Sequence, residues 1–140
     1  MPGIMLKISG RPDPDLAQRI VGKITSLTCS VLDKEPARTM VMLQFIPHDE
    51  WFIAGKSLAE LGCNSFRLEV TITDETNTKA QKAAYHKAAF AALCELIGNV
   101  HKHSNIHVID CRAGAYGYGG VTQEYRAHHP QGDEVGEARP

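Results

Sequence analysis

Proline at position 2 could supply the chemistry of this chain if Met1 is removed. Removal would leave a secondary amine at the chain terminus, on a rigid ring that has no side-chain entropy to lose. An α-amino group titrates near ~8 in water, and burial and nearby cations both disfavour its charged form. A neutral amine could act as a general base that takes a proton from the carbon beside a carbonyl and returns it elsewhere. That reaction is keto–enol tautomerisation. Many proteins have a proline at position 2 that takes no part in catalysis. The rest of the sequence around Pro2 therefore has to decide whether it is catalytic.

The first half of the chain predicts a strand, a helix and a second strand. Alternating apolar residues begin right after Pro2, at Ile4, Leu6 and Ile8. A helix should open at Asp13-Pro14, a capping acceptor followed by proline in the first turn. Its apolar residues recur every three or four positions and predict one buried stripe: Leu16, Ile20, Ile24, Leu27 and Val31. An apolar strand follows at Met40 to Ile46, and then an aromatic, glycine-containing turn at 51–55.

The second half repeats this order. Phe66, Leu68, Val70 and Ile72 begin an alternating strand, and a helix should open near Asn77-Thr78. This helix is rich in alanine, and the spacing predicts a buried stripe at Ala80, Ala84, Ala88, Ala91 and Cys94. A strand at Asn105 to Cys111 leads to a second aromatic turn at 116–120. A shift of 64 positions relates Asp13 to Asn77, Phe52 to Tyr116 and Gly55 to Gly119, and it places Pro2 on Phe66. The pattern indicates an internal duplication.

The duplication predicts an α+β fold in which two tandem β-α-β units form a four-stranded sheet with both helices on one face. The opposite face would be left bare, so we expect other subunits to cover it. We expect a single domain over residues 1–127, with one unit at about 2–57 and the other at about 66–121. Residues 128–140 lack periodicity and predict a flexible tail.

Composition argues against several classes of partner. The formal net charge is −1 and there is no block of Lys or Arg, so no electrostatic reason exists to bind nucleic acid or anionic lipid. No apolar stretch is long enough to cross a bilayer, and the N-terminus does not read as a signal peptide. Four widely spaced cysteines predict reduced thiols and a cytoplasmic protein. His101-x-His103 has no accompanying carboxylate or cysteine cluster, so we expect no metal and no cofactor.

Three segments resemble the tautomerase superfamily. Met1-Pro2-Gly3-Ile4 opening into a strand, followed by Gly10-Arg11, resembles the start of the 4-oxalocrotonate tautomerase family. The segment from Val108 to Gly120 is similar to the strand and glycine-rich hairpin near the C-terminus of that family. Lys34-Glu35-Pro36 resembles a link in the fused macrophage migration inhibitory factor family. The resemblance implies a tautomerase-like fold in a homotrimer, with active sites at subunit boundaries and Pro2 as the catalytic residue.

The same resemblance implies substrate-binding residues. Lys34 keeps the lysine of the migration inhibitory factor family, and Arg38 stands where that family has an aromatic residue; together they could hold a carboxylate and lower the pKa of the amine. Tyr116 matches an aromatic wall residue of 4-oxalocrotonate tautomerase. Arg11 matches the start of the 4-oxalocrotonate tautomerase family. Its β-α-β unit could, however, contribute to the second, proline-free site at Phe66. The family's strand arginine is missing, because its position falls on Val41 and Asn105.

The function expected is that of a cofactor-independent tautomerase or isomerase of a small 2-oxo acid, with Pro2 as general base. Two alternatives stay open. Pro2 could remain protonated and act as a general acid in hydration, dehalogenation or decarboxylation of a small unsaturated or oxo acid. The chain could also be a trimeric binding protein that kept the fold without the chemistry, and the missing arginines favour this reading somewhat.

Overall fold

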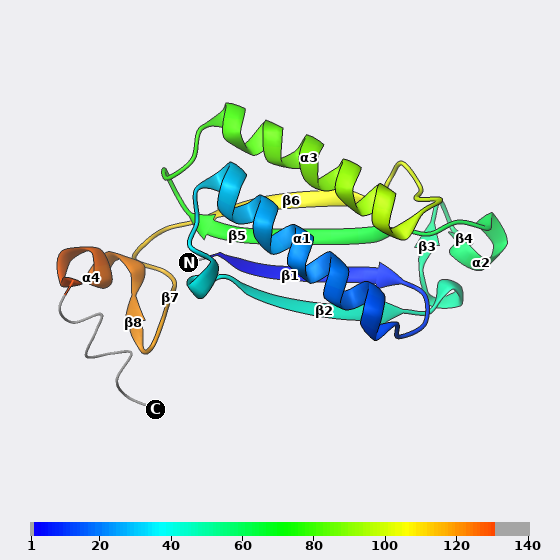
Figure 1. The fold of residues 1–140 in the computed structure, drawn as a ribbon, viewed down its shortest axis with the longest axis horizontal. Helices are drawn as coiled ribbons and strands as arrows, with labels where there is room; N and C mark the ends of the chain where they lie inside the picture. The colour runs from blue at the N-terminus through cyan, green and yellow to red at the C-terminus, as the bar shows by residue number, and fades with distance from the viewer. Residues whose placement is uncertain (1, 131–140) are drawn as a thin grey trace.

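A computed structural model describes residues 2–130 of the chain and shows the two expected β-α-β units in one sheet. The sheet has the strand order β2-β1-β5-β6 (Figure 1). The strands within each unit are parallel, and the two units meet where β1 runs antiparallel to β5. Both long helices, α1 and α3, cover the same face of the sheet.

Each unit consists of two strands of the sheet, a crossover helix, a short hairpin and a short terminal helix. The first unit contains β1 (Gly3–Ser9), α1 (Pro14–Leu32), η1 (Pro36–Arg38), β2 (Met40–Ile46), η2 (His48–Glu50), β3 (Phe52–Ile53), β4 (Lys56–Ser57) and α2 (Leu58–Leu61). The second contains β5 (Phe66–Thr73), α3 (Lys79–Ile97), β6 (Asn105–Cys111), β7 (Gly117–Tyr118), β8 (Val121–Thr122) and α4 (Gln123–His128).

The strands and the start of α1 agree with the predictions from sequence. The alternating residues of β1 and β5 are 0 or 1% exposed and form the core: Ile4, Leu6, Ile8, Phe66, Leu68, Val70 and Ile72. Asp13 caps α1, and its side chain accepts a hydrogen bond from the Leu16 amide at 3.1 Å. The predicted stripe of α1 faces the core, with Ile20 and Ile24 fully buried and Leu16, Leu27 and Val31 packed around them.

The buried face predicted for α3 is wrong. Ala80, Ala84 and Ala91 are exposed, and the helix instead buries Tyr85, Ala89, Ala92 and Leu93. Alanine occupies both faces of this helix, so apolar spacing carried little information about its orientation. The large side chains set the orientation: Tyr85 is fully buried, and its hydroxyl shares a 2.8 Å hydrogen bond with Thr28 of α1.

The repeat is real, but its step changes along the chain. The first strands of the two units, β1 and β5, are related by 64 positions. Gly3 of β1 pairs with Met40, the first residue of β2, and its equivalent Arg67 of β5 pairs with Asn105, the first residue of β6. From the helices onward the step is 65, as the starts of α1 and α3 show at Pro14 and Lys79. The cap of α3 is therefore Thr78, not Asn77, and the counterpart of Tyr116 is Trp51, not Phe52. One extra residue in the turn between β5 and α3 accounts for the difference.

The face of the sheet away from the helices carries exposed apolar side chains. Met5 is 40% exposed and Met42 is 50% exposed, and the two residues are neighbours across β1 and β2. Met40 and Ile109 are also among the exposed large hydrophobic residues. At the C-terminus, α4 includes His128, whereas residues 131–140 of the expected tail lie outside the described part of the chain.

Candidate active site at the Pro2 end of the sheet

Pro2 is buried directly before β1. Its carbonyl accepts a hydrogen bond from the Met40 amide at 3.2 Å, which fixes it against the start of β2. On the other side, Gly3 pairs with Thr71 near the end of β5. Pro2 thus lies at the end of the sheet where β1 and β2 begin and β5 and β6 finish. The glycine-containing hairpin β7–β8 and α4 follow β6 at this same end (Figure 1).

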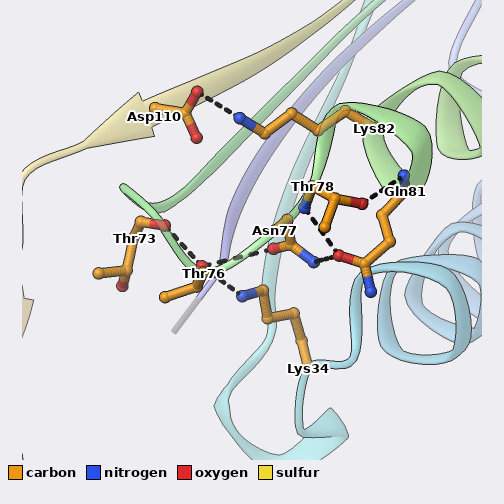
Figure 2. A network of polar contacts seen from close by, with 8 residues as sticks. All are labelled: Lys34, Thr73, Thr76, Asn77, Thr78, Gln81, Lys82 and Asp110. Atoms are coloured by element: carbon orange, nitrogen blue, oxygen red, sulfur yellow. Dashed lines mark hydrogen bonds and ion pairs between the residues drawn. The ribbon is translucent and has the colours of Figure 1, made fainter.

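Lys34 lies just beyond the C-terminus of α1, where Asp33 adopts a left-handed conformation with φ of 55°. Its Nζ donates a 3.0 Å hydrogen bond to Thr76 Oγ1, in the turn between β5 and α3 (Figure 2). Partial burial lowers the pKa of Lys34, and the neighbouring Asp33 carboxylate opposes part of this effect. Lys34 is therefore a positioned donor rather than a freely solvated cation.

Arg38 ends η1, one residue before the Thr39 that leads into β2. Its Nε lies 3.4 Å from a Glu35 carboxylate oxygen, and its guanidinium lies over the Tyr118 ring, 5.8 Å from the centroid. It also lines a cavity of about 450 Å³ at this end of the molecule. η1 and the hydrogen bond between Met40 and Pro2 thus join Arg38 to the proline end of the sheet.

Tyr116 precedes the hairpin and turns its hydroxyl toward β5, where it shares a hydrogen bond with Thr73 Oγ1. The hairpin needs a glycine next to it, because a Cβ on Gly117 would collide with the backbone carbonyl of Val121. The Gln123 amide closes the turn by donating to the Tyr116 carbonyl at 2.8 Å. Tyr116 is therefore held against its own chain.

One turn, from Thr73 to Thr78, connects Lys34 and Tyr116. Within it, Thr76 Oγ1 donates to the Thr73 carbonyl at 2.6 Å. Asn77 donates from its amide nitrogen to the Leu32 carbonyl at 2.9 Å, and Thr78 forms a capping box with Gln81 (Figure 2). The turn has little freedom, because both its ends and its side chains are bonded. Neither Thr73 nor Thr76 was identified from sequence, since single threonines in a turn carry no recognisable motif.

Arg11 lies at the other end of the sheet. It follows β1, whose seven residues span roughly 20 Å at about 3.3 Å per residue. Around it is a separate cavity of about 420 Å³, shared with Ser9, Phe45 and Asn64. The structure therefore brings together Pro2, Lys34, Arg38 and Tyr116 in one chain, but not Arg11.

Arg126 is the charged residue that sequence reasoning missed. It lies in α4, is only 6% exposed, and lines the same cavity as Arg38. Its Nη2 donates to the Tyr118 carbonyl, and its guanidinium carbon lies 3.7 Å from the centroid of the Tyr118 ring. The sequence prediction ended the ordered domain at 127 and predicted no helix there, so nothing indicated that this arginine would be buried.

Within residues 2–130, no group of three or more His, Cys, Asp and Glu side chains could hold a metal ion. The rings of His101 and His103 stack on one another with centroids 5.5 Å apart.

None of the described helices is both long enough and apolar enough to span a membrane. Cys29, Cys63, Cys94 and Cys111 are all free thiols.

Comparison with solved structures decides the fold. A fused 4-OT, a wild-type symmetric trimer, superposes with a TM-score of 0.73 at 16% identity, covering 87% of this chain and 96% of its own. The protein Pt0534, solved after inactivation by 2-oxo-3-pentynoate, gives a TM-score of 0.77 at 15% identity, covering 88% and 98%. This chain has the fold of the tautomerase superfamily, in its fused two-unit form.

A macrophage migration inhibitory factor-like protein from Entamoeba histolytica shares the tautomerase fold at a TM-score of 0.66 and 12% identity, covering 86% of this chain and 97% of its own. No protein-family model matches the sequence, and no curated protein matches it either. The structural matches thus confirm the predicted fold and its resemblance to this superfamily. At sequence identities this low, the substrate of a similar protein cannot be transferred to this chain.

Proposed function

We propose that this chain is a cofactor-independent tautomerase or isomerase of a small 2-oxo acid. The N-terminal amine of Pro2, exposed by removal of Met1, serves as the general base. The observation that carries the proposal is the burial of Pro2 at the end of the sheet where Lys34, Arg38 and Tyr116 also gather. A buried amine near cations favours its neutral form, which is the form a base requires.

In the proposed reaction, the amine takes a proton from the carbon beside the substrate's keto group, and a dienolate or enolate forms. Arg38 and Lys34 hold the carboxylate and the developing negative charge through charged hydrogen bonds. The protonated amine then gives the proton to the enolate oxygen, or to a different carbon of the dienolate, and the neutral amine is restored. Arg11 could join this site only from another subunit, because in its own chain it lies at the far end of β1.

We propose that the protein is a homotrimer. The exposed apolar side chains on the open face of the sheet, Met5 and Met42 among them, support association through that face. The similar fused 4-OT is a symmetric trimer. Light scattering should give three chains per particle, and a monomer across micromolar concentrations would contradict this. We also propose a cytoplasmic location, which four free thiols suit.

Two measurements test the proposed chemistry. Intact mass should show that Met1 is absent, because a retained methionine would make the nitrogen of Pro2 an amide. Pro2→Ala should slow keto–enol exchange of phenylpyruvate or 2-hydroxymuconate by about 10²–10⁴-fold, the usual loss for a general base. The trimer should persist in this variant. An unchanged rate would place the chemistry elsewhere.

The pH–rate profile separates the base from the general-acid alternative. If Pro2 is the base, the rate rises as its amine deprotonates; if it donates a proton to an unsaturated or oxo acid, the rate falls over the same range. A wild-type protein inactive on every oxo acid tried would favour the binding-protein alternative.

A further inference from the structure

Lys34 is held at both ends of the residue. Its backbone amide donates to the Cys29 carbonyl at 3.1 Å, just beyond the end of α1, and its Nζ donates at 3.0 Å to Thr76 Oγ1. The turn that carries Thr76 is tied to the same end of the helix, because Asn77 donates to the Leu32 carbonyl at 2.9 Å (Figure 2). The position of the ammonium group is therefore set by the turn after β5 as well as by α1.

The hydroxyl of Thr76 has its proton committed elsewhere. Thr76 Oγ1 donates to the Thr73 carbonyl at 2.6 Å, a shorter contact than the 3.4 Å to Asn77 Oδ1. The lone pairs of the hydroxyl oxygen are then left for the Lys34 ammonium, which can only donate. The bonds run in one direction, from Lys34 through Thr76 to the Thr73 carbonyl, and each polarises the next. This arrangement favours the charged lysine and opposes the lowering of its pKa by burial.

Figure 2 shows two lysines that have different kinds of partner. Lys82 Nζ lies 2.7 Å from a carboxylate oxygen of Asp110, which compensates its charge. Lys34 forms no salt bridge within residues 2–130, and the neighbouring Asp33 raises its pKa by charge attraction without forming an ion pair. The hydroxyl of Thr76 thus holds the Lys34 ammonium without neutralising it. An ammonium has three N–H donors, so two are left for an anionic group.

The opposite end of the sheet has no equivalent of this pair. With the step of 65 that relates α1 to α3, Lys34 corresponds to Asn99, whose side-chain amide donates to a backbone carbonyl at 2.8 Å. The turn before α1 that corresponds to the turn of Thr76, residues 10–13, contains no serine or threonine. The lysine and its hydroxyl partner therefore belong to the end of the sheet that carries Pro2, and they are not a requirement of the repeated fold.

We propose that Thr76 is a positioning residue for Lys34. Its hydroxyl fixes the ammonium group in one place and keeps its charge available to an anionic partner. The role of Lys34 toward the substrate rests on the proposed function, whereas the control of Thr76 over the position and protonation of Lys34 does not.

The first test needs no substrate. Protein labelled with ¹³C-lysine is titrated with base while the Hε–Cε correlation of Lys34, assigned with Lys34→Arg, is followed by NMR. Thr76→Val removes the hydroxyl at nearly constant shape, so the pKa of Lys34 should fall because a bond to its charged form is lost. Thr76→Ser should restore the wild-type titration. Thr25→Val, at a half-buried position on α1, is the control and should leave Lys34 unchanged. An unchanged pKa of Lys34 in Thr76→Val would overturn the proposal.

A double-mutant cycle tests whether Thr76 acts through Lys34. On a 2-oxo acid, Thr76→Val should lower kcat/KM by about three- to tenfold, the range for one hydrogen bond, and Thr76→Ser should recover most of the loss. In a Lys34→Met background the same Thr76→Val change should alter kcat/KM by less than about twofold, because the group that the hydroxyl positions is already absent. Losses that multiply in full would show that Thr76 acts by shaping the turn, and would refute the positioning role.

The positioning role and the proposed function fail separately. A fall in the pKa of Lys34 in Thr76→Val, in a protein that turns over no oxo acid, would support the role of Thr76 and contradict the tautomerase. Turnover of an oxo acid by a protein whose Lys34 titration does not respond to Thr76→Val would do the reverse.

Discussion

Pro2 and Phe66 occupy equivalent positions in the two halves of the sheet and lie at its opposite ends. The register establishes this, because Gly3 and Arg67 pair with the first residues of β2 and β6. Phe66 is internal to the chain and fully buried, and its peptide nitrogen has no basicity. The duplicated fold can therefore carry one reactive amine per chain, and the equivalent position of the second unit can provide only packing.

The open face of the sheet gives the first prediction. Met42→Glu should dissociate the proposed trimer in the low micromolar range, because it places a charge in an apolar patch beside Met5. Ala91→Glu, at an exposed position on α3, is the control and should leave the particle size unchanged. Sedimentation or light scattering reports both. A Met42→Glu protein that stays trimeric would show that another surface holds the subunits together.

The buried Tyr85 hydroxyl gives a pH-dependent prediction. Burial raises the pKa of Tyr85 from 10.0 to about 12, and the hydrogen bond between Tyr85 and Thr28 offsets part of the rise. A pKa raised in the folded state means that the unfolded chain loses its proton first. The stability contributed by the neutral hydroxyl is therefore fully present below pH 10 and is lost as pH rises from 10 toward 12.

Tyr85→Phe should cost about 0.5–1.5 kcal/mol at pH 7, because the bond to Thr28 is lost while Thr28 still donates to the Ile24 carbonyl. Between pH 10 and 11 the gap from wild type should narrow, since the variant has no hydroxyl to ionise. Urea unfolding at both pH values measures this. Tyr125→Phe, at an exposed position on α4, is the control. A gap independent of pH would mean that Tyr85 does not titrate in this range.

Strand positions were predictable because burial on one face leaves a direct mark on sequence. β5 alternates strictly and β1 does so from Ile4 to Ile8, and β2 and β6 have the predicted bounds. The orientation of α3 was not predictable, because its alanines lie on all sides and Tyr85 carries a hydroxyl whose partner, Thr28, is on another helix.

The candidate site was predictable only in part, for a related reason. Pro2 could be recognised from its position directly after Met1. Arg126, by contrast, becomes part of a cavity only through the packing of α4 beside Tyr118. The hydroxyls of Thr73 and Thr76 acquire roles through residues that are distant in sequence, Tyr116 and Lys34. Such contacts follow from the tertiary structure, and neither spacing nor composition records them.

The hydrogen bond between Tyr116 and Thr73 predicts a modest role for the tyrosine hydroxyl in turnover. Because Thr73 already engages it, Tyr116→Phe should reduce kcat less than about tenfold, in line with about 1 kcal/mol for one neutral hydrogen bond. Thr73→Val should have an effect of similar size, and the double variant should lose less than the sum of the two. Steady-state kinetics on one oxo acid decides this. A loss of 10²-fold or more in Tyr116→Phe alone would instead mark the hydroxyl as a donor to the substrate.

The last prediction concerns Arg38, which lies on the segment that leads from Lys34 into the strand bonded to Pro2. If Arg38 holds the substrate carboxylate, Arg38→Ala should cost about 1.5–3 kcal/mol in kcat/KM on acidic substrates, the loss expected for a charged hydrogen bond. A neutral ketone should be nearly unaffected. The same change should raise the apparent pKa of Pro2, because removing a nearby cation makes protonation of the amine easier. The rate that depends on the neutral amine should then rise at higher pH than in the wild type.

The control variant is Glu35→Gln, which removes the exposed partner of Arg38 while keeping the arginine. It should leave turnover of the acidic substrate close to wild type. Equal losses of Arg38→Ala on acidic and neutral substrates, with an unmoved pH profile, would show that Arg38 is a surface charge without a role in the site.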